Sequence, residues 1–233
     1  MAMDAILAAL PSSTSCSSCT INVFPSRVRN TRGRRTGAVL ELSCRAGCVA
    51  RETTAQIIQQ CHRTHGGRIE LHNCIADVIS SAMKNKGWTV VQQPHVRTAV
   101  GLRKPDIIAY RNGVGVIVDA QVISGQRDLD GLHREKRNKY GNHDELVEKV
   151  AGILGLPCKG SVHSTSCTLS WRGVWSLASY RELKRFVGLD EGVLAGVPSL
   201  VLRGSHMNWG RFNRHPSRLR WGARVRASCD CKD

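Results

Sequence analysis

The stretch KPDIIAYRNGVGVIVDAQV, residues 104–122, most constrains what this chain can fold into. Two apolar runs flank Asn112-Gly113, and an Asn-Gly pair between such runs is a strong local signal for a β-hairpin with a two-residue loop. The loop fixes the register of the two strands, since Arg111 must then lie opposite Val114. Followed back along the strands, this register places Asp106 directly opposite Asp119.

Two aspartates opposite each other in a sheet require an explanation. Directly opposed residues share one face, with Cβ atoms roughly 4.5–5.5 Å apart, where like charges repel. A divalent cation with oxygen ligands, Mg²⁺ above all, would turn the repulsion between Asp106 and Asp119 into chelation. The alternative is that the strands fray and both acids face solvent. Pro105 is consistent with fraying, because proline favours strand starts and edges.

The segment LDGLHREKRNKYG, residues 129–141, predicts a helix that places cations near these acids. On a helix, His133, Lys136 and Tyr140 share one face, and Lys139 lies one turn after Lys136. A lysine beside a two-carboxylate metal site could position the attacking water and neutralise charge on phosphate oxygens during phosphodiester hydrolysis. The alternative is a solvated basic helix face.

The charge balance favours a polyanionic partner. Lys and Arg number 34 against 18 Asp and Glu, a formal net charge of +16, which is typical of nucleic-acid binding. The alternatives are a basic organelle protein, for which the Ser- and Arg-rich residues 12–37 offer only a compositional resemblance to a transit peptide, or a membrane-surface protein. No apolar run approaches the roughly 20 residues of a membrane span, and a secretory signal is not predicted. The candidate nucleic-acid contacts are Arg27, Arg29, Arg32, Arg34, Arg35, Arg103 and Lys104.

The order of elements predicts a mixed α/β (α+β) fold, because strands are followed by helices, one more strand and further helices. Predicted strands cover 88–96, 107–110, 114–122 and 162–171, and predicted helices cover 52–61, 69–85, 129–140, 145–154, 178–187 and 190–197. We divide the chain into a basic, disordered arm (1–40), a Cys/His-rich unit with its following helix (41–85), a core (86–200) and a basic tail (201–233).

The Cys/His-rich unit is a candidate zinc site. With no export signal, the ten cysteines are read as reduced thiols or metal ligands. Cys44, Cys48 and Cys61 could supply three ligands. A fourth is needed, and the candidates in order are His65, His62 and Cys74. The alternative is a zinc-free cluster of small buried thiols.

Pro105-Asp106, Asp119 and the nearby lysines resemble the PD-(D/E)XK restriction-like nucleases, although Gln121 stands where that motif usually has lysine. More specifically, the chain is similar to the C-terminal part of non-LTR retrotransposon proteins of the R-two type, which insert into ribosomal RNA genes. The similarity covers about residues 21–213. The matching stretches include ETTAQIIQQCHRTHGGRI, GLRKPDIIAY, VDAQVISGQRDLDGLHREKRNKYGN and LRGSHMNWGRFN.

The resemblance implies a restriction-endonuclease-like core that nicks target DNA so that the free 3′ end primes reverse transcription. It implies that Asp106 and Asp119 bind Mg²⁺ or Mn²⁺ and that Lys136 or Lys139 is the catalytic lysine. Supporting roles fall to Gln121, His133 and Tyr140. It also implies a CCHC zinc knuckle, which is degenerate here because Gln56 occupies the histidine position.

The resemblance further implies DNA, with ribosomal RNA genes as candidate targets, and element RNA as partners, and a nuclear location. Nothing in the chain resembles a polymerase core, so a fragment lacking the reverse transcriptase is expected. An alternative function stays open: a catalytically idle nucleic-acid-binding module or pseudogene product of a truncated element.

Overall fold

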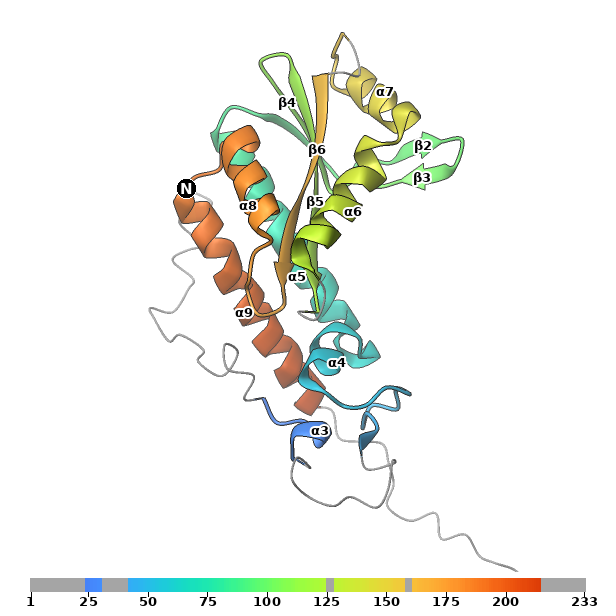
Figure 1. Ribbon diagram of the computed structural model, residues 1–233, viewed down its shortest axis with the longest axis vertical. Helices are drawn as coiled ribbons and strands as arrows, with labels where there is room; N and C mark the ends of the chain where they lie inside the picture. Colours follow the sequence, from blue (N-terminus) through green and yellow to red (C-terminus); the bar gives the residue numbers. More distant parts are fainter. Residues whose placement is uncertain (1–23, 31–41, 125–127, 158–160, 215–233) are drawn as a thin grey trace, which may run out of the picture.

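A computed structural model describes residues 24–30, 42–124, 128–157 and 161–214 (Figure 1). Its centre is a four-stranded sheet in the order β1-β4-β5-β6. The sheet strands are β1 (Thr89–Gln92), β4 (Ile107–Arg111), β5 (Val114–Ile123) and β6 (Val162–Ser170). A separate two-stranded hairpin consists of β2 (Val96–Thr98) and β3 (Gly101–Arg103). The helices are α3 (Arg27–Asn30), α4 (Thr54–Gln59), η2 (His62–Thr64), α5 (His65–Asn85), α6 (Leu129–Gly141), α7 (Asp144–Ile153), α8 (Leu177–Glu182), η4 (Leu183–Val187) and α9 (Glu191–Arg214).

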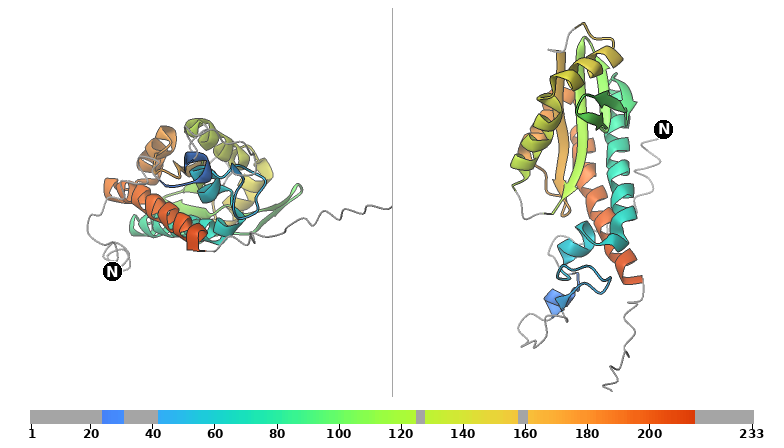
Figure 2. Two further views of the ribbon diagram at one scale, coloured as in Figure 1. Left: turned by 90° about the horizontal axis from the view of Figure 1, so that it is seen from below. Right: turned by 90° about the vertical axis from the view of Figure 1, so that its right-hand side faces the viewer.

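The sheet separates two layers of helices, which Figure 2 shows edge-on in its right-hand view. Strands β1, β4 and β5 are antiparallel, whereas β6 runs parallel to β5. Successive residues of a strand point to opposite faces, so β5 contributes to two cores. Val116 and Val118 pack with α5, η4 and α9 on one side. Ile117 packs with α6 and α7 on the other. A mixed α/β fold is therefore confirmed.

The hairpin of β4 and β5 has the register predicted from its loop. Asn112 and Gly113 both have positive φ, +51° and +80°, as a type I′ turn requires. Pairing runs from Arg111 opposite Val114 to Ile107 opposite Val118. The regular ladder ends there, and Asp106 lies in a bend one residue before β4.

Two predicted boundaries were wrong in the first half of the chain. The expected strand 88–96 is divided at Gln93, whose φ is +47°, so that β1 and β2 belong to different sheets. Helix α5 begins at His65, before the predicted start at residue 69, and so includes Gly66-Gly67. A Cβ at Gly67 would lie 1.9 Å from Asn208 Oδ1 of α9, so this glycine allows α5 and α9 to approach closely.

The last helix extends much further than expected. Helix α9 runs through Arg214, so residues 201–214 are helix and not part of a basic tail. Val201, Ser205, Asn208 and Phe212 recur at helical spacing and are buried, while Arg211 pairs with Glu70 of α5 and Arg214 is exposed. The remainder of the predicted tail, 215–233, lies outside the described residues.

The N-terminal segment 24–30 packs against this helix, contrary to the expectation of a disordered arm. Phe24 is buried and stacks on Trp209, with ring centroids 5.0 Å apart. Trp209 Nε1 donates a hydrogen bond to Pro25 O at 3.3 Å. The rest of the predicted arm lies outside the described residues. In the described part of the chain, no helix combines the length and the apolar character needed to cross a membrane.

Candidate active site

The Asp106 carboxylate, just before β4, contacts the backbone of β5 beside Asp119. Asp119 is 3% exposed and points into the α6 side of the sheet. Asp106 Oδ2 accepts a hydrogen bond of 2.7 Å from the backbone N–H of Ala120, the residue after Asp119. Asp106 thus reaches β5 from a bend instead of lying in the ladder, and its carboxylate contacts the backbone directly beside Asp119. Neither carboxylate is freely solvated.

Helix α6 directs two polar groups at Asp119. Lys136 Nζ donates to Asp119 Oδ2, and Tyr140 OH donates to Asp119 Oδ1 at 2.8 Å. Lys136 and Tyr140 are four residues apart and therefore share a helix face. Burial and the nearby carboxylates raise the pKa of Tyr140 far above its ordinary value, so the phenol keeps its proton and remains a donor. Both carboxylate oxygens of Asp119 are thus occupied.

Lys139 lies next to Tyr140 instead of Asp119. Its Nζ is 3.2 Å from Tyr140 OH and 4.7 Å from the centroid of that ring. Of the two lysines proposed from the sequence, Lys136 is the one in contact with a carboxylate.

His72 of α5 belongs to this site, although no pattern in the sequence pointed to this residue. Its Nε2 lies 3.0 Å from Asp106 Oδ1. The hydrogen bond to Asp106 raises the pKa of His72, which favours the cationic form. Each carboxylate therefore has one cationic partner, His72 for Asp106 and Lys136 for Asp119. The pairing depends on α5 packing against the sheet, and no local motif near His72 encodes it.

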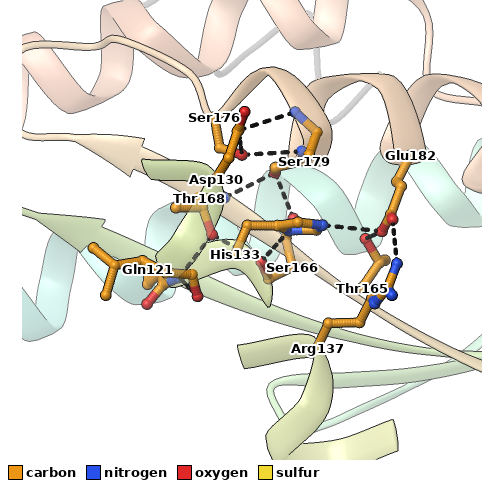
Figure 3. Close-up of polar contacts among 12 residues, drawn as sticks. Gln121, Asp130, His133, Arg137, Thr165, Ser166, Thr168, Ser176, Ser179 and Glu182 are labelled. Carbon is orange, nitrogen blue, oxygen red and sulfur yellow. Dashed lines mark hydrogen bonds and ion pairs between the residues drawn. The ribbon is translucent and has the colours of Figure 1, made fainter. Parts of the chain in front are cut away.

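Two other predicted residues, Gln121 and His133, lie in a polar network beside the carboxylates instead of contacting them (Figure 3). Gln121 Nε2 donates to Thr168 Oγ1 at 2.7 Å and to Leu132 O at 3.2 Å. His133 is buried, and its Nδ1 lies 2.8 Å from Ser166 Oγ. Gln121, two residues after Asp119, thus links β5 to β6 and α6.

Glu182 of α8 completes this network. It pairs with His133 Nε2 at 3.2 Å and Arg137 Nη1 at 2.9 Å, and it accepts a bond of 2.7 Å from Thr165 Oγ1. Burial alone would raise the pKa of Glu182, but these contacts outweigh burial and lower the pKa to about 2. The carboxylate is therefore ionised at neutral pH and holds α6, β6 and α8 together.

Asp130, one turn before His133 on α6, attaches this helix to the start of α8. It accepts bonds from Ser176 Oγ at 2.6 Å and from the N–H of Ala178 at 3.1 Å. Asp130, His133 and Arg137 recur at intervals of three and four residues, so one side of α6 is fixed by directional polar contacts. This side sets the rotation of α6 and hence the direction of Lys136.

The three predicted zinc-binding thiols also come together, outside the sheet, where η2 meets the end of α9. The Sγ atoms of Cys44, Cys48 and Cys61 all lie within 4.8 Å of one another. Cys61 Sγ is 4.0 Å from Cys44 Sγ and 3.8 Å from Cys48 Sγ. Tetrahedral zinc with Zn–S bonds of about 2.3 Å places sulfurs about 3.8 Å apart, so the thiols have the spacing of a zinc site.

Of the fourth-ligand candidates, His62 is the one next to the thiols. Its Nδ1 lies 3.5 Å from Cys48 Sγ, close to the roughly 3.6 Å expected between nitrogen and sulfur on one zinc ion. His65 instead lies beside Arg68, with Nδ1 3.4 Å from Nη2. Burial would raise the pKa of Cys48, but hydrogen bonds with His62 and the other thiols lower it to about 7. A thiolate, the form that binds zinc, is thus accessible at neutral pH.

Known proteins similar to this chain are retrotransposon polyproteins. A retrovirus-related Pol polyprotein from type-1 retrotransposable element R2 of Nasonia vitripennis is 39% identical over 194 residues, 83% of this chain and 18% of the relative. The corresponding type-2 R2DM protein of Drosophila melanogaster is 37% identical over 190 residues, 79% and 17% of the two chains. That of Bradysia coprophila is 34% identical over 200 residues, 86% and 22%. No protein-family model matches.

This chain is homologous to a region of the R2 Pol polyproteins. The family resemblance inferred from the sequence is thereby confirmed. The R2 homologue spans between 17% and 22% of the length of these three relatives.

The residues predicted to contact nucleic acid lie in different places in the R2 homologue. Arg103 and Lys104 are next to the carboxylates, because they immediately precede Pro105-Asp106. Arg27 Nη1 donates to Ser43 O at 2.9 Å and holds α3 to the cysteine unit. Arg29 is exposed on α3. Arg32, Arg34 and Arg35 lie outside the described residues.

Proposed function

We propose that this chain contains a metal-dependent DNA endonuclease of the PD-(D/E)XK type, which nicks target DNA for a retrotransposon. One observation carries the proposal: the Asp106 carboxylate is bonded to the backbone N–H of the residue after Asp119, and the Lys136 ammonium contacts the Asp119 carboxylate. Homology to R2 Pol polyproteins supports a nucleic-acid substrate, as does the net charge of +16.

The donor set fits a hard divalent cation. Carboxylate oxygens are preferred ligands of Mg²⁺, which is commonly held by one or two carboxylates and several waters. Without an ion, His72 and Lys136 compensate the charges of Asp106 and Asp119. A bound cation would polarise the scissile phosphate and lower the pKa of a coordinated water.

The protein's own groups have distinct tasks in this proposal. The charge of Lys136, which lies beside Asp119, would stabilise the negative charge that builds up on the phosphate during cleavage. Tyr140 holds one oxygen of Asp119 and so fixes the direction of the other. The hydrogen bond from Ala120 N orients Asp106 in the same way. Pre-positioning both carboxylates avoids rearrangement when substrate binds.

A structural zinc ion on Cys44, Cys48, Cys61 and His62 completes the proposal, since the thiol spacing matches zinc. In this arrangement His62 takes the role of the CCHC histidine, whose position in the sequence is occupied by Gln56. Gln56 is buried, and neither polar atom of its side chain has a hydrogen-bond partner among the residues that the structure describes. We further infer that the chain acts in the nucleus, on ribosomal RNA gene DNA, with element RNA as a second partner.

A plasmid-nicking assay tests the proposal. Supercoiled plasmids with and without a ribosomal RNA gene fragment are incubated with the protein and Mg²⁺, and open circles are counted. We expect nicking by the wild type that requires Mg²⁺ and is lost in Asp119→Asn. Asp190→Asn is the matched control, because this exposed aspartate pairs with Lys86 away from the site. Equal nicking by the wild type and Asp119→Asn would refute the assignment.

The second candidate function, an idle nucleic-acid-binding module, gives a different result in the same experiment. Binding without nicking by either protein would select it. In both cases affinity should fall steeply as salt rises, because phosphate contacts release counterions.

A further inference from the structure

The β2–β3 hairpin is packed on one side only. Val96 and Thr98 of β2 are buried on the inner side of the hairpin, and Val96 joins the core between the sheet and α7. The pairing places Arg97 opposite Leu102, and these two share the outer side, away from the core. Figure 1 shows the hairpin projecting from the body of the molecule beside α6 and α7.

Helix α7 holds the hairpin in this projecting position. Lys149 Nζ donates to Arg97 O at 2.6 Å, and the N–H of Ala99 donates to Glu145 Oε2 at 2.8 Å. Glu145 also pairs with Lys149 at 2.8 Å, so its negative charge is compensated. Two backbone groups of the hairpin are thus fixed, one of them in the loop at its tip, and the hairpin is a rigid projection.

The tip and the outer side combine aliphatic and cationic groups. Val100 in the loop is 65% exposed and Leu102 is 48% exposed. Arg97 and Lys104 are exposed on either side. Single exposed aliphatic residues are common, but here two lie together at the end of a rigid element, flanked by positive charge.

The hairpin is continuous with the candidate active site. Strand β3 leads through Lys104-Pro105 to Asp106, and Lys104 O accepts a hydrogen bond of 3.4 Å from Tyr140 OH. Arg103 is half-buried, and its Nε has no hydrogen-bond partner in the described residues. Asp106 is six positions after Val100 in the chain, so the Cα atoms of the two residues are at most about 22 Å apart.

We propose that the β2–β3 hairpin binds duplex DNA beside the scissile phosphate, with Val100 and Leu102 inserted between base pairs and Arg97 and Lys104 on phosphates. The inference rests on the proposed endonuclease. Apolar wedges flanked by cations partly unstack base steps and kink the duplex, while lysines and arginines supply the affinity for phosphates. At roughly 3.4 Å per base pair, a reach of about 22 Å places the unstacked step within about seven base pairs of the nick.

Fluorescence of 2-aminopurine, which rises when the base unstacks, tests the inference without cleavage. Duplexes of 24 base pairs carry one 2-aminopurine, either at a flexible thymine–purine step or inside an A-tract, and Ca²⁺ replaces Mg²⁺. We expect the wild type to raise the fluorescence more at the flexible step, because such steps deform easily. Val100→Ser with Leu102→Ser should abolish the rise and weaken binding by about tenfold, since the wedge and its bend are lost.

The matched control is Val174→Ser with Leu177→Ser, which removes two equally exposed aliphatic groups, 56% and 52%, at the turn between β6 and α8. This control should behave as the wild type. An unchanged rise in the Val100/Leu102 variant, or no rise with the wild type in any duplex, would overturn the inference and point to another partner for the hairpin, such as a protein. A normal rise from a wild type that fails to nick plasmid would instead refute the endonuclease and leave the DNA-binding hairpin standing.

Discussion

Lys136 and Lys139 lie three residues apart on α6, yet only Lys136 touches a carboxylate. We expect Lys136→Met to reduce plasmid nicking roughly 10²–10³-fold, because a positive charge that stabilises the transition state is lost. Lys139→Met is the matched control and should retain activity within about threefold, as for a surface charge away from the reacting phosphate. Equal losses in both variants would contradict the assignment of Lys136.

At the cysteine unit, His62 and His65 can likewise be compared, because only one of these two histidines contacts a thiol. We expect the wild type to contain about one zinc ion per chain by elemental analysis, held by three thiolates and His62. His62→Ala should lower the zinc content, because Nδ1 of His62 lies 3.5 Å from Cys48 Sγ. His65→Ala, whose side chain faces Arg68, should leave the content unchanged. A loss only in the His65 variant would reverse the assignment.

Single residues show what the sequence could and could not predict. Asp106 and Asp119 were predictable because one Asn-Gly turn fixes the register of both. His72 was not, since it lies 34 residues before Asp106 and meets it only when α5 packs on the sheet. His133 has the helical spacing of Lys136, but the partners that turn it away from the site, Ser166 and Glu182, are distant in sequence.

Helix α6 is attached to its neighbours by polar contacts, and Glu182 is their common acceptor. The pKa of Glu182 is lowered from 4.5 to about 2. A lowered carboxyl pKa stabilises the folded state above the unfolded pKa, and this stability is lost as the pH falls toward the folded pKa. The contribution should therefore be complete above about pH 5 and should disappear between about pH 4.5 and pH 2.

We expect Glu182→Gln to lower the free energy of unfolding at pH 7 by roughly 2–3 kcal/mol, since the ionised form of Glu182 is the one stabilised in the fold. The difference from the wild type should shrink as the pH falls from about 4.5 to about 2. Urea unfolding at a series of pH values measures it. A difference that stays constant over this range would show that Glu182 does not titrate as described.

Elements were predictable where their signals are local. The hairpin of β4 and β5 is encoded by its turn, and α6 by its capping aspartate and the period of its side chains. Helix α9 was cut short, because Pro198 and the arginines after it are typical of a helix end. Pro198 is nevertheless accommodated within the helix, whose later turns bury Val201, Ser205 and Phe212.

At the scale of the whole molecule, α5 and α9 pack closely along one side of the sheet. A Cβ at Gly204 of α9 would lie 2.7 Å from Leu71 Cδ1 of α5, whereas one at Gly196 would meet nothing within 4 Å. We expect Gly204→Ala to lower the free energy of unfolding by about 1–3 kcal/mol through overpacking. Gly196→Ala should raise it by up to about 1 kcal/mol, because alanine favours the helix. Thermal unfolding of both variants checks this, and equal shifts would contradict the packing.

The layered α/β arrangement was predictable from the order of elements, whereas the docking of residues 24–30 and 42–61 onto the end of α9 was not. That contact joins segments that are far apart in the sequence: Trp209 Nε1 donates to Pro25 O across a separation of 184 residues. Its partners are an apolar pair, Phe24 and Trp209, whose sequence neighbourhoods are basic and therefore typical of exposed segments.

This docking has a consequence for how the protein is made. Cys44, Cys48 and Cys61 leave the ribosome about 150 residues before Phe212, which packs against two of them. At typical synthesis rates of about 5–20 residues per second, the thiols wait on the order of ten seconds for their cover. During that interval Cys44 and Cys61 lack the apolar cover that Phe212 gives them in the folded chain, so their thiols are accessible to solvent only before α9 is complete.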